Sequence, residues 1–412
     1  MSAEEPVDPD SLTGANWMSG IADQRRISEI NLPGTHDSGT SKVRCGNAFT
    51  DEYGIEFAKC QSLRISEQLK IGIRYLDLRL SNDHEVRMRT EDEAKKGMSE
   101  AEADEKDGKR KTVDDGKNLW LVHGSYNSVL FGIVNVNMRF FAYGTGTERS
   151  LDDVMQVLKE FLAKNPTETV IINVCRETGT EDMSRDEQIA LVNKRLKEHF
   201  DRYKDIIYGN GVFTGIPTMG ECRGKVVVLS ENPDKVGYGT NYWGAWESSS
   251  VDDGSRKPMM NIAGHDFYYE NHYGALEGDK ENWIRSFYNE LGGEALPIDP
   301  NNHLDHGILV QSSSNVILKD TPEMVANYIN PILYTGKNAL FKKRGIFYGW
   351  VLSDFVTAET AKTLWITNFP ECVHDMNVFE VKPATCTEDG RKRYYECNVN
   401  FPLILRLSET NN

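Results

Sequence analysis

Short apolar runs alternate along the chain with longer segments in which apolar residues recur every three or four positions. The short runs have the length of buried strands, and the longer segments have the spacing of amphipathic helices. The pattern predicts strands at 169–174, 225–229 and 345–352. Strands that alternate with helices are typical of an α/β fold with a parallel sheet.

Three of the predicted helices have recognisable starts. Ser184, with Glu187 three residues later, forms the pattern of a capping box before an amphipathic stretch. Another helix is expected to begin near Thr357. Ser150 can cap a helix whose apolar residues share one face, namely Val154, Val157, Leu158, Phe161 and Leu162.

Two segments break this alternation. Residues 84–117 are dense in acidic and basic residues, which indicates a solvated surface helix or flexible loop rather than a binding site. Residues 373–412 differ in character and contain two cysteines. We therefore expect an N-terminal extension at 1–22, a single main domain at 23–372 that carries the charged insertion, and a small C-terminal appendage.

Charge and hydropathy limit the function classes. The net charge of -16 opposes a nucleic-acid partner, because phosphate backbones attract basic surfaces. No stretch reaches the roughly 20 consecutive apolar residues of a membrane span. The acidic start of the chain lacks the basic and apolar regions of a secretory signal. We expect a soluble protein that is either intracellular or has lost its signal.

Seven cysteines leave at least one thiol unpaired. Two local disulfides are conceivable, Cys45 with Cys60 and Cys386 with Cys397, and reduced buried thiols are an equally good interpretation. The chain has no Cys-x-x-Cys pair and no histidine-rich cluster, so a structural zinc is not expected.

Four apolar runs end in titratable residues, at 32–40 (LPGTHDSGT), 75–79 (YLDLR), 121–124 (LVHG) and 350–354 (WVLSD). Residues two apart on a strand share a face, so the aspartate and the arginine of YLDLR point the same way. The carboxyl ends of parallel barrel strands converge on one mouth. We therefore expect one site that contains His36, Asp77, Arg79, His123 and Asp354.

This residue set suits cleavage of a phosphodiester by a paired general base and general acid. One imidazole takes the proton of the attacking hydroxyl, and the other protonates the leaving oxygen. Each imidazole needs a carboxylate to fix its tautomer, and the guanidinium supplies fixed positive charge for the phosphoryl oxygens. A divalent cation performs that task in many phosphodiesterases, but this set does not require one.

The other histidines considered are interpreted as ordinary polar residues: His84, His199, His303, His306 and His374. In isolation, Asp77 with Arg79 fits a structural ion pair equally well. The surrounding motifs favour a functional interpretation.

Several ordered motifs give the chain a resemblance to a known family. They are LPGTHDSGT, QLKIGIRYLDLRL, LVHG, YINP at 328–331 and GWVLSDF at 349–355. Over roughly residues 20–370 the chain resembles the metal-independent, X-domain family of bacterial phosphatidylinositol-specific phospholipases C. The resemblance implies a distorted TIM (β/α)8 barrel, no cofactor and no metal. Phosphatidylinositol in a membrane surface would be the partner, and we expect a monomer.

The resemblance implies a role for each imidazole of the expected site. His36 would be the base that acts on the inositol 2-hydroxyl, and Asp354 would orient it. His123 would be the acid that protonates the diacylglycerol oxygen, assisted by Asp37.

The resemblance extends to charged and aromatic residues around the two imidazoles. Arg79 would hold the phosphate, and Asp77 would lie between these groups. Asp266 and Tyr268 resemble an Asp-x-Tyr motif that contacts and stacks on inositol in the family. Arg176 is at a position where the family has a basic residue.

The sequence also departs from the family pattern. The 44-residue step from Arg79 to His123 exceeds the short connection of the compact members, and Ser230 and Glu231 replace an expected basic inositol-binding residue. The headgroup preference therefore stays open. The run PATCTEDG at 383–390 resembles appended segments of secreted bacterial proteins, which favours an extracellular location.

Four apolar residues are candidates for membrane contact. Ile317 and Leu318 follow a polar loop that should reach the barrel mouth, where insertion into lipid and simple packing are equally good interpretations. Trp243 and Trp246 fit core or rim filling slightly better than membrane contact.

The sequence thus predicts a lyase that cleaves phosphatidylinositol to diacylglycerol and inositol 1,2-cyclic phosphate. One alternative is a metal-dependent glycerophosphodiester phosphodiesterase, whose acidic ligand cluster Arg79 would oppose. Another is a non-catalytic inositol-lipid binding module, which would not need the full set of acid, base and phosphate-binding groups.

Overall fold

A computed structural model gives the structure of this chain and describes most of residues 8–370 together with three short strands beyond them. The described residues are 8–45, 55–99, 102–103, 106, 110–130, 134–142, 148–177, 183–243, 259–272, 276–291, 296–297, 303–314, 319–370, 382–383, 394–396 and 405–406. Only the backbone is described at 45, 110, 124–130, 134–142, 242–243, 259, 277, 296–297 and in the last three strands.

The chain divides into two compact units, residues 1–370 and residues 371–412. The described part of the second unit is an antiparallel sheet of β17 (Lys382–Pro383), β18 (Tyr394–Glu396) and β19 (Leu405–Arg406). Everything else described here belongs to the first unit.

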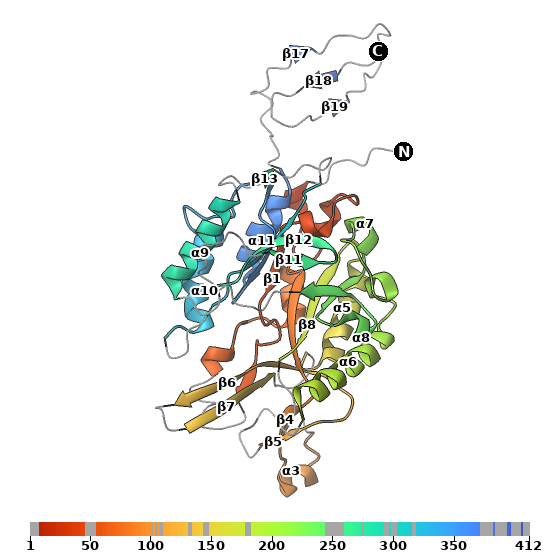
Figure 1. The fold of residues 1–412 in the computed structure, drawn as a ribbon, viewed down its shortest axis with the longest axis vertical. Helices are drawn as coiled ribbons and strands as arrows, with labels where there is room; N and C mark the ends of the chain where they lie inside the picture. The colour runs from red at the N-terminus through yellow and green to blue at the C-terminus, as the bar shows by residue number, and fades with distance from the viewer. Residues whose placement is uncertain are drawn as a thin grey trace. The chain divides into compact units, whose positions relative to one another are not determined.

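Nine of the described strands form a closed ring of hydrogen-bonded neighbours in the first unit (Figure 1). The order is β1-β16-β14-β12-β11-β10-β9-β8-β3, and β3 pairs back to β1. Their bounds are β1 (Leu32–Thr35), β3 (Tyr75–Ser81), β8 (Val170–Arg176), β9 (Val226–Ser230), β10 (Thr240–Trp243), β11 (Met259–Ile262), β12 (His265–Glu270), β14 (Gly307–Gln311) and β16 (Trp350–Ser353).

One strand distorts an otherwise parallel barrel. β11 is antiparallel to both of its neighbours, β10 and β12, while the other pairs around the ring are parallel. Eight of the nine described ring strands therefore run in one direction, as in a (β/α)8 barrel. The expected distorted α/β barrel is confirmed.

Helices cover the outside of the ring (Figure 1). α5, α6, α7 and α8 lie on one side, and α9 and α10 lie on the other. The helix bounds are α2 (Ile65–Ile71), α3 (Glu91–Lys95), α5 (Leu151–Lys164), α6 (Arg185–Arg202), α7 (Met219–Cys222), α8 (Pro233–Val236), α9 (Glu277–Glu290), α10 (Pro322–Asn330) and α11 (Ala358–Trp365). Short helical turns are η1 (Pro9–Ser11), η2 (Trp17–Gly20), η3 (Ile27–Glu29), η4 (Tyr208–Asn210), η5 (Pro331–Thr335) and η6 (Ile366–Asn368).

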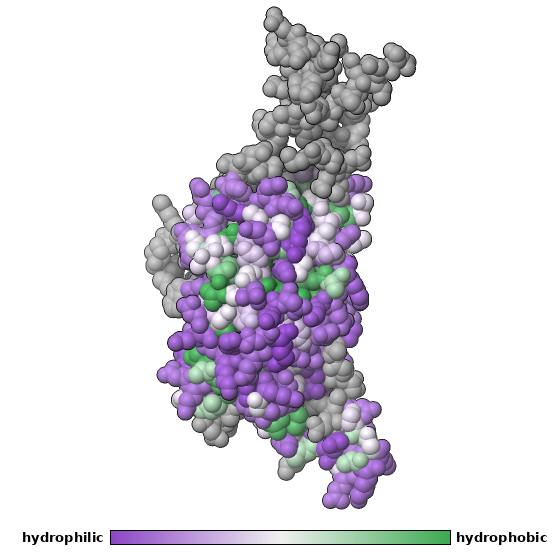
Figure 2. All heavy atoms as spheres, turned by 90° about the vertical axis from the view of Figure 1, so that its right-hand side faces the viewer, coloured by the Kyte–Doolittle hydropathy of each residue, from purple (hydrophilic) through white to green (hydrophobic). Residues whose placement is uncertain are grey.

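The predicted helix starts agree with the observed caps. The hydroxyls of Ser150, Ser184 and Thr357 each accept a hydrogen bond from a backbone N–H in the first turn of α5, α6 and α11. Such caps satisfy a donor that has no partner within the helix. The outer face over α6, α7 and α8 is mostly hydrophilic (Figure 2), as the amphipathic pattern requires.

Two of the three predicted strands form as expected, and the third is divided. The runs at 169–174 and 225–229 become β8 and β9. The run at 345–352 becomes β15 (Ile346–Phe347) and β16, because Gly349 adopts a φ of 90° between them. β15 pairs outside the ring with β13 (Leu296–Pro297).

The charged insertion at 84–117 forms a hairpin in the described residues. β4 (His84–Arg87) pairs antiparallel with β5 (Arg110–Val113), and α3 between them has no buried residue. Next along the chain, β6 (Trp120–Leu130) and β7 (Val134–Ala142) form a long hairpin that extends the sheet from β3 to β2 (Val43–Cys45).

Aromatic rings fill the barrel interior. Tyr75 of β3 contacts Trp350 of β16 with ring centroids 5.6 Å apart, and Phe267 of β12 contacts Trp350 at 4.8 Å. These strands are not neighbours in the ring, so the side chains meet across its interior. Gly307 lies beside Phe267, and a Cβ there would come within 2.3 Å of the phenyl ring.

Part of the segment expected as an N-terminal extension packs into the core. Trp17 and Met18 are fully buried, and the Trp17 ring stacks on Trp365 of α11 at 6.0 Å. The buried Arg74 guanidinium donates to the Gly14 carbonyl at 2.8 Å. In the described part of the chain, no helix combines the length and apolar character needed to cross a bilayer.

Candidate active site

The inward face of β3 carries two of the predicted residues. Because Tyr75 points into the barrel, the strand period of two also directs Asp77 and Arg79 inward, toward the carboxyl end of the strand. Asp77 is fully buried and Arg79 is 9% exposed. The Asp77 carboxylate accepts hydrogen bonds from the backbone N–H of Asp37 at 3.1 Å and from the Asn173 amide at 3.3 Å.

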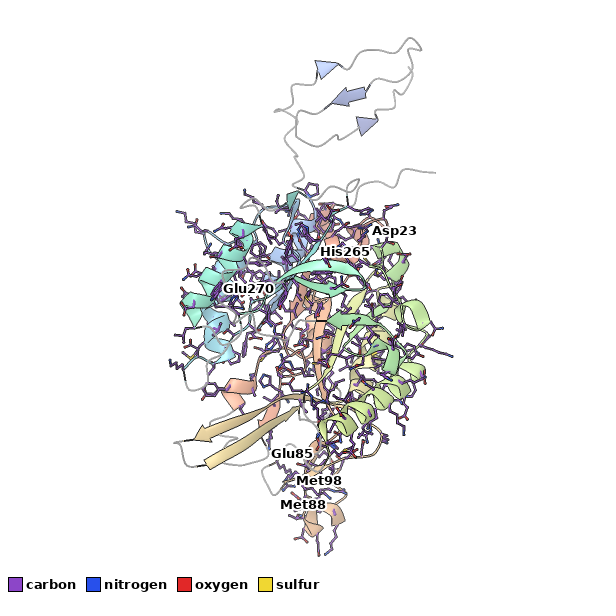
Figure 3. All side chains as sticks on the ribbon, viewed as in Figure 1. Asp23, Glu85, Met88, Met98, His265 and Glu270 are labelled. Carbon is purple, nitrogen blue, oxygen red and sulfur yellow. The ribbon has the colours of Figure 1, made fainter. Side chains whose placement is uncertain are left out.

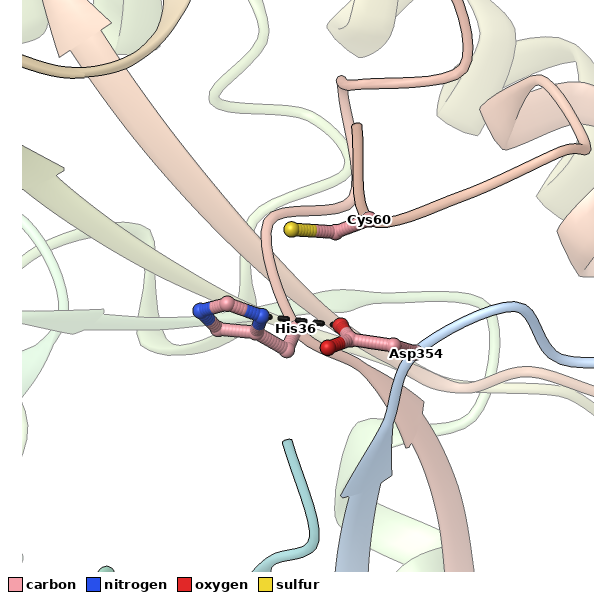
Figure 4. A group of neighbouring side chains, drawn as sticks. All are labelled: His36, Cys60 and Asp354. Atoms are coloured by element: carbon pink, nitrogen blue, oxygen red, sulfur yellow. Dashed lines mark hydrogen bonds and ion pairs between the residues drawn. The ribbon is translucent and has the colours of Figure 1, made fainter. Parts of the chain in front are cut away.

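His36 and Asp354 follow two neighbouring parallel strands. Thr35 at the end of β1 pairs with Ser353 at the end of β16, so the next residues lie side by side. His36 Nδ1 is 2.8 Å from Asp354 Oδ1 (Figure 4), and both residues are 2% exposed. The order of the strands around the barrel thus brings together two residues that are far apart in the sequence.

The tautomer of His36 follows from its second neighbour. Arg79 Nη2 is 2.8 Å from His36 Nε2. A guanidinium can only donate, so Nε2 accepts and the proton of the neutral ring lies on Nδ1, where it is donated to Asp354. The lone pair on Nε2 is therefore the basic position of His36.

Backbone strain lies beside both members of this pair. Asp37 has a φ of 45° and Phe355 has a φ of 48°, which are uncommon values for residues other than glycine. Such strain is often concentrated at functional sites. The turns after β1 and β16 thereby place His36 and Asp354 against each other.

Arg79 lies among three carboxylates. Its Nε is 3.3 Å from Asp77 Oδ2 and 3.4 Å from Asp37 Oδ2, and its Nη1 is 3.4 Å from Glu177 Oε1. Burial lowers the pKa of Arg79, but Asp37, Glu177 and Asp77 outweigh burial and raise it well above its usual value. Arg79 is thus a permanent positive charge fixed in position.

His123 reaches the same point from the hairpin outside the ring. Its imidazole is edge-on to that of His36, with centroids 6.4 Å apart and an interplanar angle of 88°. Its Nε2 is 3.1 Å from Asp37 Oδ2. Burial, followed by the positive charges of Arg79 and His36, lowers the pKa of His123 well below its usual value.

The pKa of Asp37, the carboxyl partner of His123, shifts in the opposite direction. Burial raises the pKa of Asp37 well above its ordinary range, although Arg79 opposes the shift. The two shifts favour a neutral pair, a carboxyl group beside an uncharged imidazole, over an ion pair. Burial also raises the pKa of Asp354, against the opposing effect of His36. All five residues expected at the mouth, together with Asp37, lie in one buried cluster.

Two residues that contact this cluster were not predicted. Gln61 links the turns after β1 and β16, because its Nε2 donates to the carbonyls of His36 at 2.8 Å and Ser353 at 3.0 Å. Glu177 contacts Arg79 from the loop after β8. Both residues come from connections that show no periodic pattern, so only the position of Glu177 at a strand end could have indicated it.

Asp266 and Tyr268 are not brought to this cluster, which corrects the expected inositol contact. β12 runs from His265 to Glu270 (Figure 3), and its carboxyl end, at the mouth, is Glu270. Asp266 is exposed near the amino end, where its carboxylate accepts from Asn261 at 2.8 Å. Tyr268 packs with the helix-covered cluster outside the ring and lies 4.6 Å from the His306 ring.

Arg176 also points away from the cluster. It ends β8 one residue beyond Cys175, the pairing partner of Arg79, so its side chain lies on the opposite face. Its Nη1 donates to Gln188 of α6 at 3.1 Å. The predicted membrane contacts Trp246, Ile317 and Leu318 lie outside the described residues, and only the backbone of Trp243 is described.

Cys60 is a free buried thiol, so it does not pair with Cys45. Cys386 and Cys397 lie outside the described residues. Among the remaining histidines, His84 stacks on Trp120 at 3.6 Å, His199 is buried beside Arg202, and His303 contacts Glu29 at 3.0 Å. His374 also lies outside the described residues.

Two groups in the described residues have the ligand types of a metal site. One is His36, Cys60 and Asp354, and the other is Asp37, Cys60 and His123. In each group, one ligand atom per residue lies within 4.8 Å of the others.

By fold, the chain is a distorted α/β barrel of the kind found in bacterial phosphatidylinositol-specific phospholipases C. The enzyme of that name from Staphylococcus aureus, solved as a double mutant, matches 89% of this chain and 100% of its own, with a TM-score of 0.56 and 18% identity. The Listeria monocytogenes enzyme matches 87% of this chain and 99% of its own, with a TM-score of 0.52 and 21% identity.

Sequence comparison finds curated relatives in the same two organisms. A protein of Listeria monocytogenes named 1-phosphatidylinositol phosphodiesterase is 25% identical over 228 residues, which are 55% of this chain and 51% of that protein. The chain thus spans about half the length of this relative. A Staphylococcus aureus protein of the same name is 24% identical over 358 residues, 84% of this chain and 90% of that protein. No family model matches the chain. The resemblance indicated by the motifs is confirmed.

Proposed function

We propose that the protein is a phosphatidylinositol-specific phospholipase C of the lyase type. The observation that carries this proposal is the position of Arg79 between two imidazole–carboxylate pairs. Its guanidinium contacts His36 Nε2 at 2.8 Å and Asp37 at 3.4 Å, and Asp37 in turn contacts His123. The names of the curated relatives and of the structural neighbours support the same substrate class.

His36 is the general base in this mechanism. Its Nε2 takes the proton of the inositol 2-hydroxyl while that oxygen forms a bond to phosphorus. The positive charge that develops on the ring is stabilised by Asp354, which holds Nδ1 at 2.8 Å. Arg79 then turns its donors from the imidazole to the phosphoryl oxygens, where negative charge gathers.

His123 is the general acid. The bond from phosphorus to the glycerol oxygen breaks, and that oxygen takes a proton from His123, which gives diacylglycerol and inositol 1,2-cyclic phosphate. Without substrate, the surroundings of His123 lower its pKa and disfavour the charged ring. The negative charge of a bound phosphodiester opposes that effect, so substrate binding itself favours the protonated acid.

No metal is assigned a step, because Arg79 supplies the positive charge at the phosphate. The test is cleavage of phosphatidylinositol vesicles in excess chelator, followed by phosphorus NMR. A cyclic phosphate signal and a rate unaffected by the chelator are expected. Loss of activity that calcium restores would overturn the metal-free mechanism, and a straight-chain phosphate as the first product would overturn the lyase chemistry.

The proposed setting is an extracellular membrane surface reached by a secreted monomer. The tail motif at 383–390 supports the extracellular location, and the relatives' names support a phosphatidylinositol substrate, which lies in membranes. Contact with the membrane through Ile317 and Leu318 stays a prediction.

A further inference from the structure

A thiol that the proposed mechanism does not use lies against the His36–Asp354 pair (Figure 4). Cys60 is fully buried and free. Its backbone N–H donates to Thr40 at 3.0 Å, and its carbonyl accepts from the N–H of Phe355 at 2.8 Å. The thiol is thereby held next to both turns that form the pair.

The three side chains offer the ligand set of a borderline-soft cation. Cys60, His36 and Asp354 each place one ligand atom within 4.8 Å of the other two. Thiolate sulfur, imidazole nitrogen and carboxylate oxygen are the ligands that Zn²⁺ takes in proteins. Calcium and magnesium prefer oxygen ligands alone, so the thiol discriminates against them.

A buried carboxylate oxygen gives a second indication of a ligand. Asp354 is 2% exposed, and its Oδ2 accepts no hydrogen bond from the described residues. Nearly all buried polar atoms in proteins have a partner, so such an oxygen requires an explanation. A cation bound by this carboxylate would provide one.

The position of Arg79 favours one of the two groups that contain Cys60 as the cation site. Asp37 of the second group is 3.4 Å from the guanidinium, which repels a cation there. In the first group, Arg79 contacts Nε2 of His36, and the opposite ring nitrogen faces Asp354. A cation at Nδ1 is therefore shielded from Arg79 by the width of the imidazole.

We propose that His36, Cys60 and Asp354 form an inhibitory Zn²⁺ site. The ion binds His36 Nδ1, Cys60 Sγ and a carboxylate oxygen of Asp354, and the thiol releases its proton to solvent. A neutral imidazole has one N–H, so a metal at Nδ1 moves the ring proton to Nε2. The base then has no lone pair for the inositol hydroxyl and no longer accepts from Arg79. Inhibition rests on the proposed function, whereas binding of the ion does not.

The first test measures binding without any activity. The full chain is titrated with Co²⁺, and the thiolate-to-cobalt absorption band is recorded for the unaltered protein, Cys60→Ala and Cys222→Ala. Cys222 is a matched control, because it is also a buried free thiol and lies in α7. The band should persist in Cys222→Ala, weaken in Cys60→Ala, and disappear when Zn²⁺ is added. An equal band in Cys60→Ala would overturn the proposal.

The second test measures inhibition on phosphatidylinositol vesicles, with each variant compared with its own metal-free rate. Zn²⁺ should inhibit the unaltered protein reversibly, with chelator restoring the rate. The half-inhibiting concentration should rise at least about tenfold in Cys60→Ala, a loss comparable to that caused by removing groups that support a metal ligand. Unchanged inhibition would overturn the proposal. Cys60→Ser replaces the alanine variant if circular dichroism shows that the latter is unfolded. If the protein is inactive on these vesicles, the cobalt titration alone tests the binding site.

Discussion

The two imidazole–carboxylate pairs of the cluster differ in how the fold builds them. His36 and Asp354 follow adjacent parallel strands of the barrel and make a direct bond of 2.8 Å. His123 comes from β6, outside the ring, and is 3.1 Å from a carboxyl group that also contacts Arg79. The barrel itself thus fixes His36, the proposed base, whereas His123, the proposed acid, depends on a neighbour that it shares with Arg79. Substrate should therefore change the acid more than the base.

The largest expected effects come from replacing the two imidazoles, and they should depend on the leaving group of the substrate. His36→Ala and His123→Ala should each lower the rate on phosphatidylinositol by up to about 10,000-fold, because each removes one partner of the acid–base pair. An inositol phosphodiester with an acidic phenol as leaving group needs no protonation. On that substrate, His123→Ala should recover most of its activity and His36→Ala should not.

Steady-state kinetics on both substrates make this measurement, with circular dichroism as the control for folding. Equal recovery of both variants would contradict the assignment of base and acid. Recovery of His36→Ala alone would reverse it.

The next effect compares the two carboxyl partners. Asp354→Asn should lower kcat about 100- to 1,000-fold on either substrate, because an amide in that place can no longer stabilise the charged form of His36. Asp37→Asn should lower kcat by a similar factor on phosphatidylinositol. It should lower kcat much less on the phenol ester, whose leaving group needs no general acid. A phenol-ester rate that falls as far in Asp37→Asn as in Asp354→Asn would show that Asp37 serves the base or the phosphate instead.

A smaller effect should appear in the pH profiles. An acid is active only while protonated, and burial with the charges of Arg79 and His36 lowers the pKa of His123. kcat/KM reports the free protein, so its alkaline fall should begin below the ordinary pH range of histidine. kcat reports the complex, in which the phosphate raises the pKa of His123, so the alkaline fall of kcat should lie at higher pH than that of kcat/KM. Coincident alkaline limbs would contradict this coupling.

The sequence predicted the cluster residues that follow from strand geometry better than the residues expected around them, for a physical reason. The strand period and the meeting of strand ends suffice to place Asp77, Arg79 and Asp354 at one mouth. Asp266 and Tyr268 were expected at the site only from a motif match, and such a match does not show where β12 begins and ends. One residue's difference in a strand reverses its face, and the ends of β12 set which residues reach the mouth.

Residues from irregular connections could not be predicted in this way. Gln61 and Cys60 approach the turns through a loop without periodicity, so no pattern links them to His36. The antiparallel strand β11 likewise follows from tertiary pairing, since its sequence resembles that of any short apolar strand. The sequence therefore predicted the parallel architecture but not its distortion at this strand.

The smallest predicted effect tests how Arg79 is held. Glu177 is partly exposed and 3.4 Å from Arg79 Nη1, so Glu177→Gln should lower kcat/KM less than about fivefold, as for other solvent-screened ion pairs. Asp77 is fully buried and also accepts the N–H of the residue after His36, so Asp77→Asn should cost considerably more. Both variants are compared by kcat/KM on phosphatidylinositol vesicles. If Glu177→Gln were the more damaging of the two, Arg79 would be positioned from the loop after β8 rather than from its own strand, and the pairing of base and phosphate would not be fixed by the barrel.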